Sequence, residues 1–202
     1  MKDLIQKSIR ESIAVKQTIL ADAAFLKKIE LAAQAFITTF RGGGKILFCG
    51  NGGSAADAQH LAAELSGRFY TDRPPLYAEA LHVNSSFVTA VANDFGYDEV
   101  FARMTEAAGR RGDVLVALST SGNSLNILKA IEKAKNQGMI VVGFTGATGG
   151  KMAGLCDILL NVPSTDTPRI QEAHILIGHI ICEIVEQEMF GRYTADDTRY
   201  TT

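Results

Sequence analysis

Two pairs of potential metal ligands stand at helical spacing in this chain. His60 and Glu64 are four residues apart, and Gln171 and His179 are eight residues apart. Because an α-helix repeats every 3.6 residues, each pair is expected to share one face of its helix. Imidazole nitrogens, a carboxylate and an amide oxygen together suit a borderline divalent ion such as Zn²⁺. The alternative, which is usual for such residues on an amphipathic helix, is that they are solvated or hydrogen-bonded.

Two loops rich in glycine and hydroxyl side chains form a second group. Residues 49–54 read CGNGGS, and residues 119–124 read STSGNS. Each loop follows a short apolar run typical of a strand and precedes a helical pattern. Such a loop directs free backbone N–H groups and the positive end of a helix at one point, where hydroxyls add further donors. Two such loops predict a phosphorylated small molecule as ligand.

The first loop also fits a loose dinucleotide fingerprint, with Gly50, Gly52 and Ala55 spaced as in G-x-G-x-x-A. The acidic residue expected about 20 residues later has no clean candidate, which argues against a nicotinamide cofactor. The sequence has no GxxxxGK[ST] motif, which argues against nucleotide hydrolysis.

Composition excludes several classes of partner. The 202 residues carry a net charge of −2, which gives no electrostatic reason to expect nucleic acid or a membrane surface as partner. The three cysteines are widely spaced, which indicates reduced thiols. Charges interrupt the first 17 residues too often for a secretory signal, and no apolar run reaches the length of a membrane span. We therefore expect a cytoplasmic protein.

Apolar runs alternate with helical patterns along the chain. This alternation predicts an α/β fold with a parallel sheet covered on both faces, and ligands beyond the carboxyl ends of its strands. We expect strands at 45–49, 77–81, 114–118, 140–144 and 158–162, and helices at 1–21, 25–40, from 54 onward, 86–92, 98–108, 125–136 and 168–190.

The first and last helices leave two possibilities open. The helix at 1–21 has an apolar stripe but precedes the sheet, and the helix at 168–190 is apolar on nearly all sides from His174 to Cys182. Such surfaces are buried either in a homo-oligomer or in the core of their own subunit.

The whole pattern closely resembles phosphoheptose isomerases, the sedoheptulose 7-phosphate isomerases of the sugar isomerase (SIS) domain superfamily. The resemblance spans nearly the whole chain, to about Gly191. It rests on five segments: GNGGSAADAQHLAAELSGRF from Gly50, VANDFGY from Val91, GDVLVALSTSGNS from Gly112, GFTGATGGKMAGLCD from Gly143 and VPSTDTPRIQEAHILIGHI from Val162.

The resemblance implies one SIS domain over 1–202, with a five-stranded parallel sheet flanked by helices. Within it, 1–41 would form additional N-terminal helices, 42–190 the α/β core with the long C-terminal helix, and 191–202 a tail. It further implies a cytoplasmic homotetramer with active sites at subunit interfaces and one zinc ion per subunit. The implied role is the first step of ADP- or GDP-heptose formation, which feeds lipopolysaccharide core or other surface glycans.

Site residues carry over by position from the same resemblance. The implied phosphate ligands are Ser119, Thr120, Ser121 and Ser124, and the remaining substrate contacts are Asn51, Gly52, Gly53, Ser54, Glu64, Asn93, Asp94 and Gln171. The implied zinc ligands are His60, Glu64, Gln171 and His179. Asn93 and Asp94 also fit a helix-ending turn. One departure is Pro168, which stands where some members have an aspartate, although Asp166 is nearby.

An aldose–ketose isomerase that works through an enediol needs a base at carbon and an acid at oxygen. Glu64 and His179 line up with this base and acid in the family. The main alternative is a non-catalytic SIS protein that binds a phosphosugar or a replication initiator protein. A third is an isomerase of a hexose or pentose phosphate. Because a protein without catalysis has no reason to keep both groups, Glu64 and His179 favour the enzyme.

Overall fold

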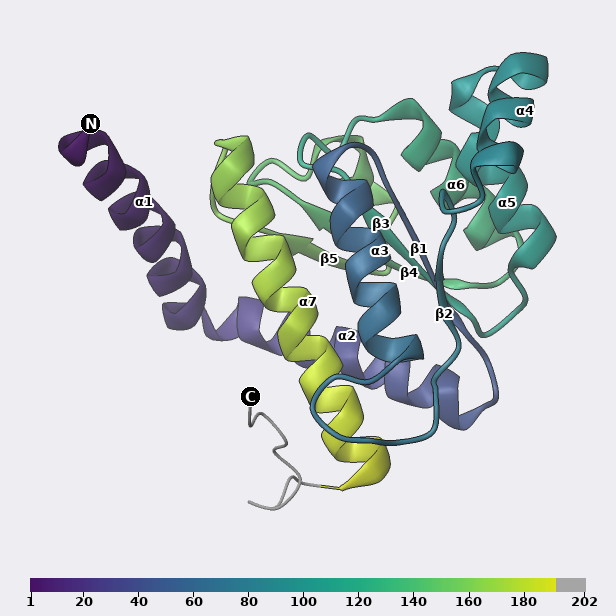
Figure 1. Cartoon of the computed structure of the whole chain (residues 1–202), viewed down its shortest axis with the longest axis horizontal. Coiled ribbons are helices and arrows are strands. Elements are labelled where there is room, and N and C mark those ends of the chain that lie inside the picture. Colours follow the sequence, from purple (N-terminus) through teal and green to yellow (C-terminus); the bar gives the residue numbers. More distant parts are fainter. Residues whose placement is uncertain (192–202) are drawn as a thin grey trace.

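The computed structural model describes residues 1–191, so the tail expected at 191–202 lies outside the described residues except for Gly191. Its five strands are all parallel and form one sheet in the order β2-β1-β3-β4-β5 (Figure 1). This confirms the predicted five-stranded parallel sheet. The strands are β1 Ile46–Gly50, β2 Ala78–Ala80, β3 Val114–Leu118, β4 Ile140–Thr145 and β5 Ile158–Asn161.

Seven α-helices of the described residues flank this sheet: α1 Lys2–Ala21, α2 Ala23–Arg41, α3 Gly53–Ser66, α4 Ser85–Phe95, α5 Val100–Ala108, α6 Leu125–Asn136 and α7 Thr167–Phe190. The helix expected at 98–108 instead begins with a 3₁₀ turn, Tyr97–Glu99, before α5. A second 3₁₀ turn, Gly150–Gly154, was not expected. Asp22 separates α1 from α2, because its carboxylate caps α2 by accepting hydrogen bonds from the N–H groups of Ala24 and Phe25.

The two faces of the sheet carry separate cores, as expected for a doubly covered parallel sheet. On one face, α2, α3 and α7 pack against alternating strand residues such as Phe48, Val116 and Phe144. On the other, α4, α5 and α6 cover residues such as Leu47 and Leu115. Figure 1 shows α3 and α7 side by side in front of the sheet, with α2 crossing beneath them.

The structure gives different answers for the first and last helices, α1 and α7, whose burial the sequence left open. Helix α7 completes the core of this chain, since Ile170, Ile177, Ile181 and Val185 are buried in the same cluster as the residues on one face of the sheet. Helix α1 projects away from the rest of the fold (Figure 1). Ile19 joins the core, but the other large apolar residues of α1 are exposed, at 67% for Leu4, 60% for Ile5, 55% for Ile9, 48% for Ile13 and 72% for Leu20.

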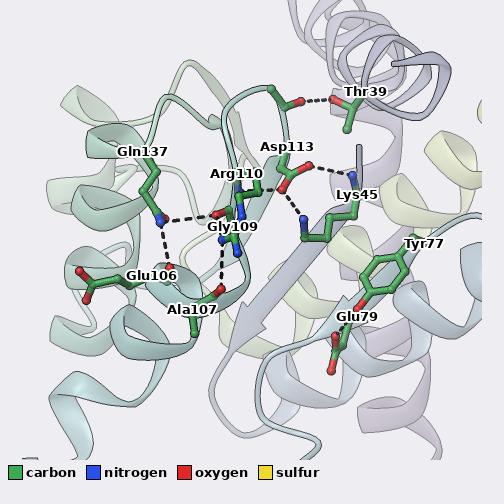
Figure 2. A network of polar contacts seen from close by, with 11 residues as sticks. Thr39, Lys45, Tyr77, Glu79, Glu106, Ala107, Gly109, Arg110, Asp113 and Gln137 are labelled. Carbon is green, nitrogen blue, oxygen red and sulfur yellow. Dashed lines mark hydrogen bonds and ion pairs between the residues drawn. The ribbon is translucent and has the colours of Figure 1, made fainter. Parts of the chain in front are cut away.

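A polar network joins the amino ends of the central strands, opposite the carboxyl ends where the substrate loops are predicted (Figure 2). Its centre is Asp113, which is 2% exposed. The Asp113 carboxylate accepts hydrogen bonds from the Lys45 backbone at 3.0 Å, the Lys45 ammonium at 2.7 Å and the Arg110 backbone at 2.8 Å. Thr39 of α2 joins the network through a 3.0 Å bond to the Gly112 carbonyl. These contacts tie β1, β3 and α2 together.

Among the described residues, no helix is both long enough and apolar enough to cross a membrane.

Candidate active site

Helices α3 and α7 run side by side and bring three predicted residues together. His60 and Glu64 come from α3, and His179 comes from α7. The close approach depends on Gly178, because a Cβ atom there would overlap the side chain of Leu61. A glycine at this point of α7 therefore lets the two helices pack near enough for their polar side chains to meet.

The three side chains form one compact cluster. The Nε2 atoms of His60 and His179 are 2.8 Å apart, and the His60 Nε2 lies 3.3 Å from a Glu64 carboxylate oxygen. The cluster is reachable from solvent, since the side chains of His60 and Glu64 are 48% and 22% exposed. Partial burial, followed by the neighbouring His60, lowers the pKa of His179, while Glu64 acts in the opposite direction. His179 is thus biased toward the neutral imidazole that a metal ligand requires.

The donor set of this cluster fits a zinc ion. Two imidazole nitrogens and one carboxylate oxygen, all within 4.8 Å of one another, form a group able to hold a metal ion. Tetrahedral zinc–nitrogen bonds would separate the two nitrogens by roughly 3.3 Å. The observed 2.8 Å between the imidazoles therefore needs only a small opening. Three protein ligands with a further position open is the usual pattern of a catalytic site.

Gln171 lies elsewhere in the same chain. Its side-chain amide sits directly over Gly53, where an added Cβ would lie 2.5 Å from the Gln171 nitrogen. Gly53 begins α3, and His60 follows seven residues later, about 10 Å further along the helix. Within one chain, Gln171 therefore contacts the first glycine loop and not the histidine cluster.

A buried ion pair that sequence reasoning missed holds the loop after α3 in place next to the histidine cluster. Arg73 and Glu186 are 2.9 Å apart, with side chains 2% and 1% exposed. Arg73 also donates to the backbone carbonyl of Glu64 at 2.9 Å. The same loop carries Phe69, whose ring centroid lies 5.7 Å from that of His179. The buried pair thus helps to position Glu64 through its backbone carbonyl and His179 through the ring of Phe69.

The second predicted loop lines a polar cavity of about 310 Å³. Six of its ten lining residues carry hydroxyls: Thr120, Ser121, Thr148, Ser164, Thr165 and Thr167. These residues follow β3, β4 and β5 or begin α7, so the cavity lies beyond the carboxyl ends of three adjacent strands. Hydroxyl donors and the amino end of α7 make this cavity suitable for a phosphate group.

Ser119 and Ser124 do not line this cavity, but they contact one another next to its lining residue Ser121. Ser119 is 4% exposed, and its hydroxyl lies 3.1 Å from that of Ser124 and 3.5 Å from that of Ser121. The structure therefore brings together the four predicted phosphate ligands, including Thr120. The hydroxyls after β4 and β5 were missed, although the segment STDT at 164–167 repeats the hydroxyl-rich composition of the predicted loop.

Close glycine contacts shape this loop. Gly122 has φ of +65°, and a Cβ there would overlap the carbonyl of Gly149. Gly150 lies as closely against Ser121 and Gly122. The Met152 N–H donates to the Gly122 carbonyl at 3.1 Å. The loops after β3 and β4 thus support each other backbone to backbone, as only glycines allow.

The first predicted loop turns sharply into α3. Gly52 has φ of +55°, and Gly53 is the first residue of the helix. Ser54 is 3% exposed and packs so closely on Gly50 that a Cβ at position 50 would overlap its backbone. The Asn51 side chain hydrogen-bonds across to Asn126 of α6, a partner that sequence reasoning did not find.

Asn93 and Asp94 lie inside α4, in its last turn before the Gly96 cap, so the helix extends past the expected end at 92 and the turn expected at these two residues is wrong. Both are exposed, and the Asn93 amide donates to the Asp94 carboxylate at 2.8 Å. At the start of α7, Asp166 holds the N-cap position, and Pro168 occupies the first turn, where proline is well tolerated.

Comparison with known proteins agrees with this architecture. The SIS domain family model matches residues 10–146. A phosphoheptose isomerase of Aneurinibacillus thermoaerophilus is 55% identical over 190 residues, covering 94% of this chain and 96% of that protein.

Two solved structures of phosphoheptose isomerases are also similar. The one from Neisseria gonorrhoeae has a TM-score of 0.87 and 43% identity, and covers 92% of this chain and 98% of its own. The one from Francisella tularensis has a TM-score of 0.88 and 39% identity, and covers 92% of this chain and 97% of its own.

Proposed function

The chain belongs to the SIS domain family and, within it, to the phosphoheptose isomerases, and from this premise we propose that it converts sedoheptulose 7-phosphate to D-glycero-D-manno-heptose 7-phosphate. The observation that carries the proposal is the cluster of Glu64, His60 and His179, reachable from solvent, on the same two helices that border the predicted substrate loops. This arrangement supplies a carboxylate and an imidazole for proton transfer.

The hydroxyl-lined cavity would hold the phosphate end of the substrate. Binding energy at this remote end would fix the carbonyl carbon and its neighbour, so that the reaction gains from orientation. The first loop, with Asn51, Gly52 and Gly53, would contact the sugar, and Gln171 lies against the same loop. We propose Gln171 first as a substrate contact, because its service as a fourth metal ligand would require its side chain to leave Gly53 or to reach a cluster in a neighbouring subunit.

Glu64 would remove the proton from C1 of the ketose and return it to C2. His179 would donate a proton to the C2 oxygen as the enediol forms and accept one from the C1 oxygen as the aldehyde appears. The number of protons on the enzyme is unchanged after one cycle. Each of these two groups is expected to contribute about 10² to 10⁴ in rate.

We further propose that His60, Glu64 and His179 hold one zinc ion per subunit. When bound, zinc would supply a Lewis acid that polarises the carbonyl oxygen of the substrate. Glu64 has two carboxylate oxygens, so one can serve as a ligand while the other faces the carbon.

A homotetramer with active sites at subunit interfaces is part of the proposal. The exposed apolar residues of α1 support it, because a stripe of this kind is normally covered. The position of the cluster supports it too. Ile170 lines the phosphate cavity, and His179 follows nine residues later, about 13 Å along α7. A site completed by a second subunit would bring a phosphate end and an acid–base cluster closer together.

In the cell we place this reaction in the cytoplasm, as the first step of ADP- or GDP-heptose formation. The decisive experiment incubates the purified protein with ketose phosphates of five, six and seven carbons and follows aldose formation by chromatography. We expect the seven-carbon substrate to give the highest kcat/KM. Tight binding of sedoheptulose 7-phosphate without turnover would instead identify a phosphosugar-binding protein, and preference for a shorter substrate would identify a different isomerase.

A further inference from the structure

Asn51 and Asn126 form a reciprocal amide pair between the two predicted substrate loops. The Asn51 nitrogen donates to the Asn126 oxygen at 2.9 Å, and the Asn126 nitrogen donates to the Asn51 oxygen at 2.9 Å. Asn51 directly follows β1, whereas Asn126 lies in the first turn of α6, two residues after Ser124. The pair therefore joins the loop assigned to the sugar to the loop assigned to the phosphate.

A third residue completes this arrangement. The Tyr97 hydroxyl donates to the same Asn51 oxygen at 3.2 Å. An amide oxygen has two lone pairs, so Asn126 and Tyr97 together occupy the acceptor capacity of Asn51. The Asn51 nitrogen has two hydrogens, one of which bonds Asn126. What remains for a ligand is therefore one N–H donor of Asn51.

Asn126 itself is poorly placed to touch a substrate. It is 4% exposed, and both of its amide groups bond Asn51. Asn51, by contrast, is half-buried beside Gly52 and Gly53, where a ligand can approach. A buried amide whose side chain serves only to hold another amide acts through that second residue.

From these contacts we propose that Asn126 is a positioning residue, which fixes the Asn51 amide so that its free N–H points to a sugar oxygen at a set distance from the phosphate loop. Tyr97 supports the same orientation from the solvent side. The inference rests on the proposed function only in taking a phosphosugar as the ligand. It explains why an asparagine, which carries a donor nitrogen and an acceptor oxygen in one plane, stands in the first turn of α6.

A double-mutant cycle tests the proposal. Wild type, Asn51→Ala, Asn126→Ala and the double variant are compared by kcat/KM for sedoheptulose 7-phosphate and by its affinity in calorimetry. We expect Asn126→Ala to lower kcat/KM about tenfold, the size of one lost hydrogen bond that leaves a buried partner unpaired. Because Asn126 acts through Asn51, its removal should cost nothing further in the Asn51→Ala background. Losses that multiply in the double variant would overturn the proposal.

Asn126→Asp covers the case in which the alanine variant fails to fold. It keeps the shape and the acceptor for the Asn51 nitrogen, but turns an oxygen toward the Asn51 oxygen. We expect a folded protein with at least about tenfold lower kcat/KM, whereas wild-type kinetics in this variant would overturn the proposal. Tyr97→Phe should give a smaller loss in the same direction. Asn136→Ala, at the exposed far end of α6, is the matched control and should behave as wild type.

The two readouts separate this inference from the proposed function. A wild type that binds sedoheptulose 7-phosphate but does not isomerise it contradicts the proposed function, while the cycle remains readable in the affinities. An active wild type with independent losses contradicts the positioning role alone. A wild type that does not bind this phosphosugar contradicts both.

Discussion

The carboxylate of Glu186 and the guanidinium of Arg73 meet 2.9 Å apart in the interior, beneath the residues assigned to catalysis. Glu186 also accepts hydrogen bonds from the backbone N–H groups of Phe69, Tyr70 and Thr71. Arg73 in turn donates to the backbone carbonyls of Leu65 and Glu64. A single pair of charges thus holds the end of α3, the loop that follows it and the end of α7 in one arrangement.

Removing one partner of this pair is expected to destabilise the protein strongly. Arg73→Met should lower the free energy of unfolding by about 3 to 5 kcal/mol, since it leaves the Glu186 charge buried without its counter-ion. Urea unfolding at fixed protein concentration measures the difference. Arg68→Met, in the same loop but exposed, is the control and should stay within about 0.5 kcal/mol of wild type. A loss for Arg73→Met no larger than that of the control would contradict the structural role.

The same pair predicts a pH dependence of stability. Burial alone would raise the pKa of Glu186, but the N–H groups of the loop and the Arg73 guanidinium outweigh it and hold the pKa below the ordinary 4.5. A carboxyl with a lowered folded-state pKa stabilises fully above its unfolded value and loses this contribution as the pH falls through its folded value. We expect the free energy of unfolding to drop as the pH falls below 4.5. In Arg73→Met the folded-state pKa of Glu186 lies closer to the unfolded value or above it, so this drop should be smaller. The same pH dependence of the free energy of unfolding below pH 4.5 in wild type and Arg73→Met would argue against coupling of Glu186 and Arg73.

Glu64→Gln tests the assignment of the base. The amide keeps the shape and one oxygen ligand but cannot accept the carbon proton, so turnover should fall by at least about 10² while the phosphosugar still binds. The measurement is deuterium incorporation at C2 of the aldose in deuterated water. If the variant exchanges the substrate proton at the wild-type rate, Glu64 is a metal ligand only.

His60→Ala tests the metal site. Protein purified without chelator is expected to contain about one zinc per wild-type chain, as three ligands of the right kind lie within 4.8 Å. His60→Ala should lose most of the metal and melt at a lower temperature, because a ligand bound only to the folded state stabilises it. Elemental analysis gives the content, with His82→Ala as a matched histidine control outside the cluster. Equal zinc in His60→Ala and wild type would remove His60 from the site.

Thr120→Ala and Ser121→Ala test the phosphate cavity. Each should weaken phosphosugar binding by about 1 to 3 kcal/mol if its hydroxyl bonds a charged oxygen. Calorimetry measures the affinities, and Thr38→Ala on the exposed face of α2 serves as the control. Unchanged affinity in both variants would show that the phosphate binds elsewhere in the molecule.

The repeating pattern of the sequence was enough to predict the sheet and the helices to within a few residues. Apolar strands such as 114–118 are buried on both faces, so their composition carries the signal directly. The exception near 98 has a local reason: the 3₁₀ turn at Tyr97–Glu99 follows Gly96, whose φ of +89° breaks the helical path. The order of the strands had no such local signal.

For a similar reason, the sequence predicted some residues of the site and missed others. Pairs on one helix, such as His60 and Glu64, follow from spacing alone, and the approach of His179 follows from helix packing at Gly178. Asn126 and Arg73 were missed, because their importance arises from partners 75 and 113 residues away. No local pattern marks a buried amide or a buried guanidinium as one half of such a pair.

Gly178 offers no chemical group to the reaction, yet its packing against Leu61 influences the distance between the proposed acid, His179, and the proposed base, Glu64. Because Leu61 fills the space that a side chain at 178 would need, an added methyl group would force the Leu61 side chain to move or α7 to shift away from α3. Proton transfer tolerates little extra distance, so such a change would slow the reaction without altering any catalytic atom. The remedy would lie on the opposite helix, where a smaller residue at 61 restores the fit. The distance between the two proposed catalytic side chains can thus be changed through positions 61 and 178, by selection or by design, without replacing either side chain.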